Sequence, residues 1–192
     1  MFLLVSPMVQ RAQAREQFHV LGGALELLQS PQLTQRLSGI YALEMLAQDE
    51  TARESAIEIL SALVRRRARR VQIPRGEAAL VADDVQAALA VLGRCALSGS
   101  AQPLDLHGIS LRGAFLPEAN FAGAFLYDCD LEGALLQDAD LSGAWLWRTN
   151  LRRVNLDGAD LRGADLGGAL HLSRDQIAAA HCDENTRLPK LS

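Results

Sequence analysis

The last part of the chain carries a large apolar residue at every fifth position. Counting from Leu106 in steps of five, every position up to Leu166 is leucine or phenylalanine. The residue two positions earlier is small or β-branched in most units, and glycine often closes the unit. The pattern ends at His171. A period of five is neither that of an α-helix nor that of a β-strand, so it indicates a different repeating structure.

The five-residue period is explained by a polygon with short extended sides. In extended backbone, residues two apart share a face, so the small residue and the large apolar residue both point inward. The residue between them points outward, and the other two turn a corner, where glycine is favoured. Coils stacked about 4.8 Å apart hydrogen-bond to one another, and each coil buries its core only against its neighbours. The pattern therefore predicts a β-solenoid.

Residues 8–97 follow a helical period and predict about four helices. Ser30 followed by Pro31 is interpreted as an N-cap with a first-turn proline, and Thr51 with Glu54 as a capping box. The apolar stripes that carry this prediction are Phe18, Leu21, Leu25 and Leu28, then Leu33, Leu37, Ile40, Leu43 and Leu46, then Ile57, Leu60, Leu63 and Val64, and last Val85, Ala88, Leu89 and Leu92.

The change of period divides the chain into four parts. We expect a helical domain over residues 1–97, a linker over 98–103 (SGSAQP), a repeat domain over 104–172, and a capping helix with a tail over 173–192. Ser173 and Gln176 form a capping-box pattern at the start of the last helix.

The repeat register resembles the pentapeptide-repeat family, whose units read A-(D/N)-L-x-x. The flanks "RLSGIYALEMLA" and "DVQAALAVLGR" look like the helical region ahead of the repeats in some members, and "LSRDQIAAAHCDENTRLP" looks like a familiar tail. The resemblance implies a right-handed four-sided parallel β-helix with twenty residues per coil. The expected fold class is thus α+β: an N-terminal helical bundle, this β-helix and a short C-terminal capping helix.

Apolar residues replace the usual Asp or Asn before the central residue in four units spaced by ten: Phe115, Phe125, Leu135 and Trp145. With four sides per coil, positions twenty apart stack directly, so Phe125, Tyr127, Trp145 and Trp147 should form one outward aromatic wall, with His107 in the coil before. Phe115 and Leu135 should form a smaller patch opposite. A contiguous apolar patch of this kind is seldom left bare on a monomer. We expect a cover, either the chain's own helical half or tail, or a second subunit or partner protein.

Composition restricts the classes of function. The chain has 192 residues, a net charge of −4 and three cysteines without metal-ligand spacing, which favours a reducing, cytoplasmic location. Its apolar start is too short to span a bilayer, and neither a signal peptide nor membrane insertion is expected. No catalytic constellation emerges from the sequence. The carboxylates of the repeats point outward on different sides, and His181-Cys182 makes a weak case for a metal. We therefore expect no enzyme activity, no cofactor and no metal site.

Two charged features suggest alternative functions. The basic run Arg65, Arg66, Arg67, Arg69 and Arg70 ends a predicted helix, where it suits the helix dipole, or else binds nucleic acid or an anionic surface. Some pentapeptide-repeat proteins mimic DNA and act on topoisomerases. Here residues 101–172 carry ten acids and five arginines, a net charge of −5. Duplex DNA of the same length, about 16 Å, carries about nine negative charges, so the protein's net charge is too small for a good match.

The sequence thus favours a protein–protein interaction module or scaffold that uses the faces of a short β-helix. The alternatives are a DNA-mimic regulator of a DNA-binding enzyme such as a topoisomerase, and an adaptor that binds anionic surfaces through Arg65–Arg70. A protein partner or self-association is expected, and nucleic acid is disfavoured as a partner because acids nearly balance the arginines of the helical half.

Overall fold

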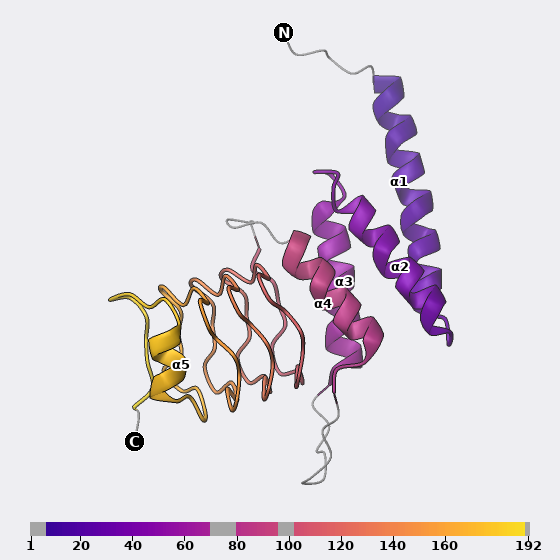
Figure 1. Cartoon of the computed structure of the whole chain (residues 1–192). Helices are drawn as coiled ribbons and strands as arrows, with labels where there is room; N and C mark the ends of the chain where they lie inside the picture. The colour runs from indigo at the N-terminus through magenta and orange to yellow at the C-terminus, as the bar shows by residue number, and fades with distance from the viewer. Residues whose placement is uncertain (1–6, 70–79, 96–101, 191–192) are drawn as a thin grey trace.

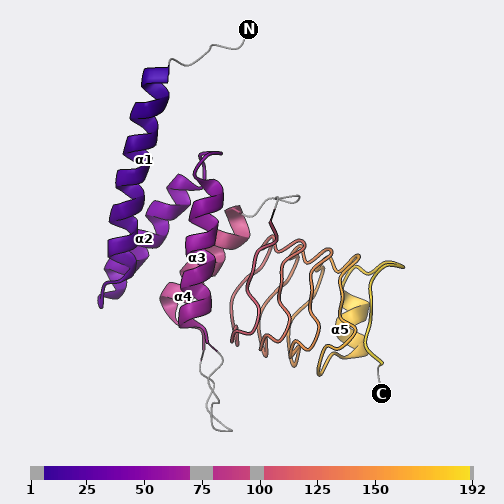
Figure 2. The same ribbon diagram turned by 180° about the vertical axis from the view of Figure 1, so that it is seen from behind.

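The computed structural model describes residues 7–69, 80–95 and 102–190. Four helices come first: α1 (Pro7–Leu28), α2 (Leu33–Leu46), α3 (Arg53–Arg67) and α4 (Asp83–Cys95). The helix α1 packs on α2, and α2, α3 and α4 pack on one another. The repeat region follows, and the short α5 (Arg174–Ala179) lies at its far end, so the helical half and α5 enclose the repeats from opposite ends (Figure 1). Figure 2 shows the same order from behind.

Two predicted helix starts in the helical half are wrong. The helix α2 begins at Leu33 rather than after Ser30, and its N-cap Gln32 makes no side-chain cap. The Ser30 hydroxyl instead accepts the N–H of Gln32 at 3.1 Å. The predicted capping box of Thr51 does not form, because the Thr51 hydroxyl and N–H both bind the Asp49 carboxylate, at 2.6 and 2.8 Å. These bonds stabilise a turn, and α3 starts only at Arg53, without a side-chain cap.

The predicted capping box of α5 is confirmed. The Ser173 hydroxyl accepts the N–H of Gln176 at 3.2 Å, and the Gln176 side chain accepts the N–H of Ser173 at 2.9 Å. The Gln176 amide also donates to the carbonyl oxygens of Leu151 and Val154, at 2.9 and 2.8 Å. The same residue therefore starts the helix and attaches it to the last coils.

The repeat region is a stack of coils joined by parallel bridges between residues twenty positions apart, such as Phe125 with Trp145 and Asn120 with Asp140. One coil thus contains four five-residue units. Each contact is a single bridged pair, and no longer strand occurs among the described residues. The register therefore produces narrow, one-residue ladders that repeat on every side of the coil.

The predicted inward register is confirmed by burial. Every central residue of the repeat is at most 2% exposed: Leu106, Leu111, Leu116, Phe121, Leu126, Leu131, Leu136, Leu141, Leu146, Leu151, Leu156, Leu161 and Leu166. The alanines two positions earlier are also buried, and the inward Thr149 hydroxyl donates to the Leu126 carbonyl at 2.6 Å. The corners adopt positive φ, as at Gly123 (67°) and also at Arg148 (57°) and Arg153 (56°), where a residue with a Cβ is strained.

The first coil is capped by the helical half. The N–H of Ser110 donates to the Ala68 carbonyl at 2.7 Å, and the N–H of Asn120 donates to the Gly93 carbonyl at 2.9 Å. On a third side the Gln86 amide accepts the N–H of Phe115 and donates to its carbonyl, at 2.9 and 2.7 Å. The backbone groups that an open solenoid end would expose are therefore paired.

The last coil is capped by the segment that follows α5. The N–H of His181 donates to the Ala159 carbonyl at 2.8 Å, and the N–H of Arg187 donates to the Ala164 carbonyl at 2.9 Å. The bridges Asp160–His181 and Asp165–Arg187 continue two ladders into this segment. Since both ends are closed, the sides of the coils are the surfaces that the repeat region offers to other molecules.

Candidate functional site

The aromatic wall, Phe125, Tyr127, Trp145 and Trp147, lies on one side of the coils, as the register predicts. The bridge between Phe125 and Trp145 stacks them in adjacent coils, and their ring centroids are 5.4 Å apart with planes at 66°. The Phe125 and Tyr127 rings are 6.3 Å apart and tilted by 53°. The His107 ring stacks on Tyr127 at 4.9 Å with an interplanar angle of 13°. The wall therefore occupies two adjacent coils, and the His107 ring continues it into the coil before.

Much of the wall is open to solvent. Trp145 is 56% and Trp147 is 48% exposed, while Phe125 and Tyr127 are half-buried. The expectation that the chain's own helical half or tail covers the wall is wrong for the described residues. The helical half and the tail stack on the ends of the solenoid, where they pair its backbone groups, and therefore leave this side open.

The edges of the wall carry charges that pair with one another. Asp128 binds Arg148 at 3.0 Å, and the Arg148 guanidinium carbon lies 5.2 Å from the centre of the Trp147 ring. Burial raises the pKa of Asp105, but hydrogen bonds from the His107 side chain (2.6 Å) and backbone outweigh it and hold this pKa below its usual value. The wall is thus apolar in the middle and nearly neutral at its edges.

The predicted patch opposite the wall also forms. Phe115 bridges to Leu135 in the next coil, and Phe115 is 59% exposed while Leu135 is half-buried. It is smaller than the wall because the third residue of this ladder is Asn155. This side therefore has the same register with less apolar surface, which makes it a matched control for the wall.

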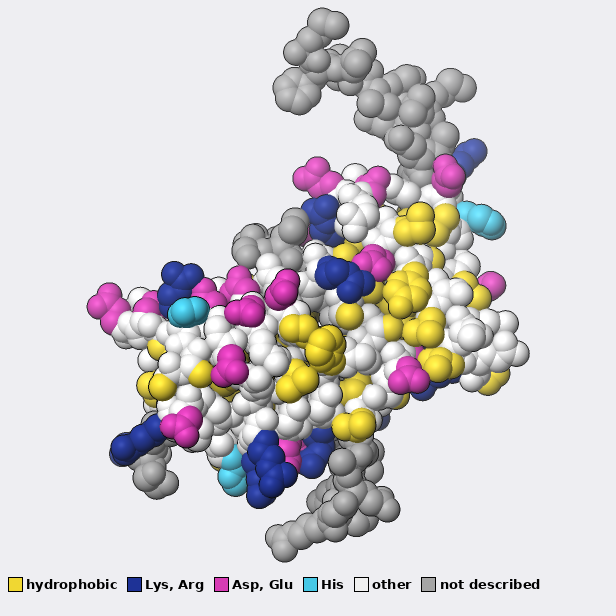
Figure 3. All heavy atoms as spheres, viewed as in Figure 1, with side chains coloured by type: hydrophobic (Ala, Val, Ile, Leu, Met, Phe, Trp, Pro, Cys, Tyr) yellow, Lys and Arg dark blue, Asp and Glu magenta, His cyan; other side chains and the backbone are white. Residues whose placement is uncertain are grey.

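The helical half exposes a further apolar group that the sequence reasoning missed. Phe18 on α1 is 74% exposed, and Tyr41 and Met45 on α2 are 50% and 78% exposed. Figure 3 shows hydrophobic side chains gathered over this part of the molecule and a smaller group over the first coils. Tyr41 and Met45 are four residues apart and so share one helix face, a signal that could have been read from the sequence.

The basic run divides into structural and exposed arginines. Arg67 binds the carboxylate of Asp84 at 2.7 Å, and Arg36 binds the same oxygen at 2.6 Å; the Asp84 side chain is only 1% exposed. Arg65 donates to the Asp105 carbonyl at 2.6 Å and so joins α3 to the first coil. Arg66 and Arg69 are exposed. The fifth member, Arg70, lies outside the described residues. Because Arg65 and Arg67 bind groups within the protein, the described arginines of the run do not form one uniform anion-binding surface.

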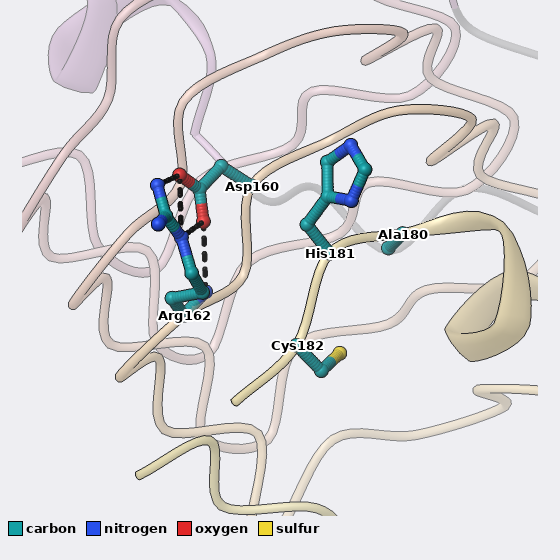
Figure 4. Close-up of a pocket in the computed structure, with 5 residues that line it drawn as sticks. All are labelled: Asp160, Arg162, Ala180, His181 and Cys182. Atoms are coloured by element: carbon teal, nitrogen blue, oxygen red, sulfur yellow. Dashed lines mark hydrogen bonds and ion pairs between the residues drawn. The ribbon is translucent and has the colours of Figure 1, made fainter. Parts of the chain in front are cut away.

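An open hollow beside the C-terminal segment holds Asp160, Arg162, Ala180, His181 and Cys182 (Figure 4). The Arg162 side chain binds both Asp160 oxygens, with its Nε at 2.9 and 3.1 Å, and this bond lowers the Asp160 pKa. Burial, followed by nearby carboxylates, raises the pKa of the Cys182 thiol, which keeps it protonated and weakly nucleophilic. In the described ranges no group of three or more His, Cys, Asp or Glu residues is placed to hold a metal ion.

Comparisons with known proteins identify the repeat. The family model described as "Pentapeptide repeats (8 copies)" matches residues 105–138 and 134–170. The chain therefore belongs to the pentapeptide-repeat family, and its N-terminal helices lie outside the match. Among curated proteins no match was found.

Several solved structures of pentapeptide repeat proteins are similar to part of the chain. One, from the Arabidopsis thaliana thylakoid lumen, is 25% identical over 41% of this chain and 58% of its own, with a TM-score of 0.29. Another, from the cyanobacterium Cyanothece 51142, is 33% identical over 47% and 67%, with a TM-score of 0.27. A third, from Nostoc PCC 7120, is 29% identical over 45% and 74%, with a TM-score of 0.19. The match thus spans about three fifths of the Arabidopsis protein, and the family assignment rests on the repeat sequence.

Proposed function

We propose that this protein is a non-enzymatic protein-binding module that holds a partner against the aromatic wall. In this proposal residues 104–172 form a right-handed four-sided β-helix, as the family resemblance implies. Its two ends are closed by the helical domain over residues 1–97 and by the cap over 173–192. The linker 98–103 joins the helical domain to the β-helix. Closed ends favour binding on a side, where the partner meets a rigid surface.

The observation that carries the proposal is the exposure of the two tryptophans of the wall, Trp145 at 56% and Trp147 at 48%, on a solenoid whose ends are capped. In eight units an Asp or Asn before the central residue accepts the N–H two positions on, as Asp140 does from Ser142 at 2.9 Å. Phe125 and Trp145 stand at this position and cannot make the bond, which forgoes about 0.5–1.5 kcal/mol in each unit. The contact between the two rings, worth about 0.5–1.5 kcal/mol, offsets part of this loss. The support for a binding role is therefore the large exposed fraction of the Trp145 ring.

The DNA-mimic alternative is less well supported. Arg112 binds Asp130 at 3.1 Å and Glu132 at 2.8 Å, and Arg148 binds Asp128 at 3.0 Å. Duplex DNA carries a dense, unneutralised negative charge, whereas these acids are neutralised within the protein. Arg65 and Arg67 form ion pairs within the protein, which leaves Arg66 and Arg69 among the described arginines of the basic run for the anionic-surface alternative.

No helix in the described ranges is long and apolar enough to cross a membrane. The cytoplasmic location stays a prediction.

The proposal is tested by capture of partners with wall and control variants. The wall variant combines Tyr127→Ala with Trp145→Ala, and the control combines Phe115→Ala with Leu135→Ala on the opposite side. Pull-downs from nuclease-treated extract should recover a partner with the wild type and the control but lose it with the wall variant. Equal recovery by both variants, or loss of all partners after nuclease treatment, would contradict the proposal.

A further inference from the structure

The size of the wall limits what it can hold; this step rests on the proposed function. One side of a coil has about three extended residues, about 10 Å, and the wall with its flanking coils is about 15 Å tall. A stable interface between folded proteins buries about 800 Å² on each partner, several times the area of such a face. The wall alone is therefore smaller than the interface of a stable dimer, and its size suits a short segment of a partner chain.

The backbone of the wall has no edge to offer an added strand. The N–H of Phe125 donates to Leu104 and its carbonyl accepts from Leu106, at 2.9 and 3.0 Å. The N–H of Trp145 donates to Ala124 and its carbonyl accepts from Leu126, both at 2.9 Å. Strand addition is therefore excluded on this side. A segment must bind by its side chains, in a conformation that needs no backbone partner, and polyproline II is such a conformation.

The geometry of the rings favours proline over a flat ligand. The Phe125 ring is tilted by 53° to Tyr127 and by 66° to Trp145, so the rings form notches instead of one plane. A polyproline II helix repeats every three residues, about 9.3 Å, which is close to the spacing of two coils, about 9.6 Å. Residues three apart in the ligand would therefore lie against the His107 and Trp147 rows, which are two coils apart.

The polar atoms of the wall also suit this ligand. Within the described part of the chain, the Tyr127 hydroxyl and the Trp145 indole N–H make no hydrogen bond to the protein, so both are available to a ligand carbonyl. The charges at the edges are paired, as in Asp128 with Arg148. Binding of an uncharged segment therefore does not bury an unpaired charge of the wall. We infer that the aromatic wall binds a short proline-rich segment of a partner protein in the polyproline II conformation.

The experiment uses the protein's own fluorescence. Trp145 and Trp147 are the only two tryptophans of the chain, so the emission spectrum reports on the wall alone. A twelve-residue polyproline peptide should cause a saturable blue shift, and a Gly-Ser peptide of equal length should not. Tyr127→Ala keeps both fluorophores and should weaken binding about tenfold or more. Leu135→Ala, on the opposite side, should change the affinity less than twofold.

Other occupants give distinct results. No shift with polyproline, or an equal shift with the Gly-Ser peptide, overturns the inference. A shift with cellohexaose alone identifies a glycan surface, and a concentration-dependent dimer that Tyr127→Ala dissociates identifies a second copy; both overturn it. Thermal melts by circular dichroism show that each variant is folded. If partner capture depends on the wall but polyproline does not bind, the proposed function stands and this inference alone fails.

Discussion

Replacing Asp84 by asparagine should destabilise the helical half strongly. Asp84 lies in the first turn of α4, and its carboxylate is bound by Arg36 of α2 and Arg67 of α3, at 2.6 and 2.7 Å. The Asp84 side chain is 1% exposed, so one buried carboxylate joins three helices. The asparagine side chain would keep the shape but leave two guanidinium groups without a counter-charge.

The expected loss follows from the number of bonds and their exposure. Hydrogen bonds between charged groups contribute about 1.5–3 kcal/mol each, so two give about 3–6 kcal/mol, in line with about 3–5 kcal/mol for breaking a buried pair. The Arg67 side chain is 35% exposed and regains water, whereas Arg36 is only 12% exposed. We therefore expect the lower end, about 3 kcal/mol, or a decrease in Tm of about 6–12 °C for a chain of this size.

The matched control is Asp83→Asn, which removes the same charge from an exposed neighbour in the first turn of α4. Urea and thermal unfolding followed by circular dichroism should show a small loss for this control, within about 0.5 kcal/mol. A loss below about 1 kcal/mol for Asp84→Asn, or equal losses in the two variants, would refute the claim that the carboxylate joins the three helices.

Three further predictions concern the repeats and the charges. Leu136→Asp should lower the free energy of unfolding by more than about 3 kcal/mol, because it buries an unpaired charge, while Gln137→Asp should have little effect; equal losses would refute the inward register. The variant with Arg66→Gln and Arg69→Gln should match the wild type in binding DNA and anionic vesicles, and salt-sensitive binding by the wild type alone would revive the anionic-surface alternative. The Asp183 carboxylate accepts the backbone N–H of the corner residue Gly163, and chiefly for this reason the pKa of Asp183 falls to about 2. Its contribution to stability should therefore be present above about pH 4 and lost as the pH falls through about 2. Asp183→Asn should remove that part of the acid unfolding profile, and an unchanged profile would contradict the assignment.

The sequence predicts the repeats well because their register is local. One unit decides which residues point inward, and positions twenty apart then stack, so the pattern alone places Phe125, Tyr127, Trp145 and Trp147 on one side. The capping box of α5 was also readable, because both of its partners lie within four residues. Such patterns can be read from the sequence because the interacting positions are fixed by a short, regular spacing.

The remaining features depend on partners far apart in the chain. The sequence left open whether the helical half or another protein covers the wall, because the helical half stacks end-on, through bonds such as that between Gln86 and Phe115, which no local pattern reveals. The ion pairs of Asp84 join residues on three helices and could not be read from the sequence. Even the local prediction at Thr51 failed, because the nearer Asp49 competes for its hydroxyl.

The central claim is that the aromatic wall is open in the isolated protein and serves as a binding surface. Acrylamide quenching of tryptophan fluorescence tests it most directly, because both tryptophans of the chain belong to the wall. The account predicts that the isolated monomer is quenched at a large fraction of the rate of free N-acetyltryptophanamide and emits at a wavelength typical of exposed indole. Strong protection from acrylamide together with blue-shifted emission in the monomer would show that the chain covers its own wall and would contradict the account.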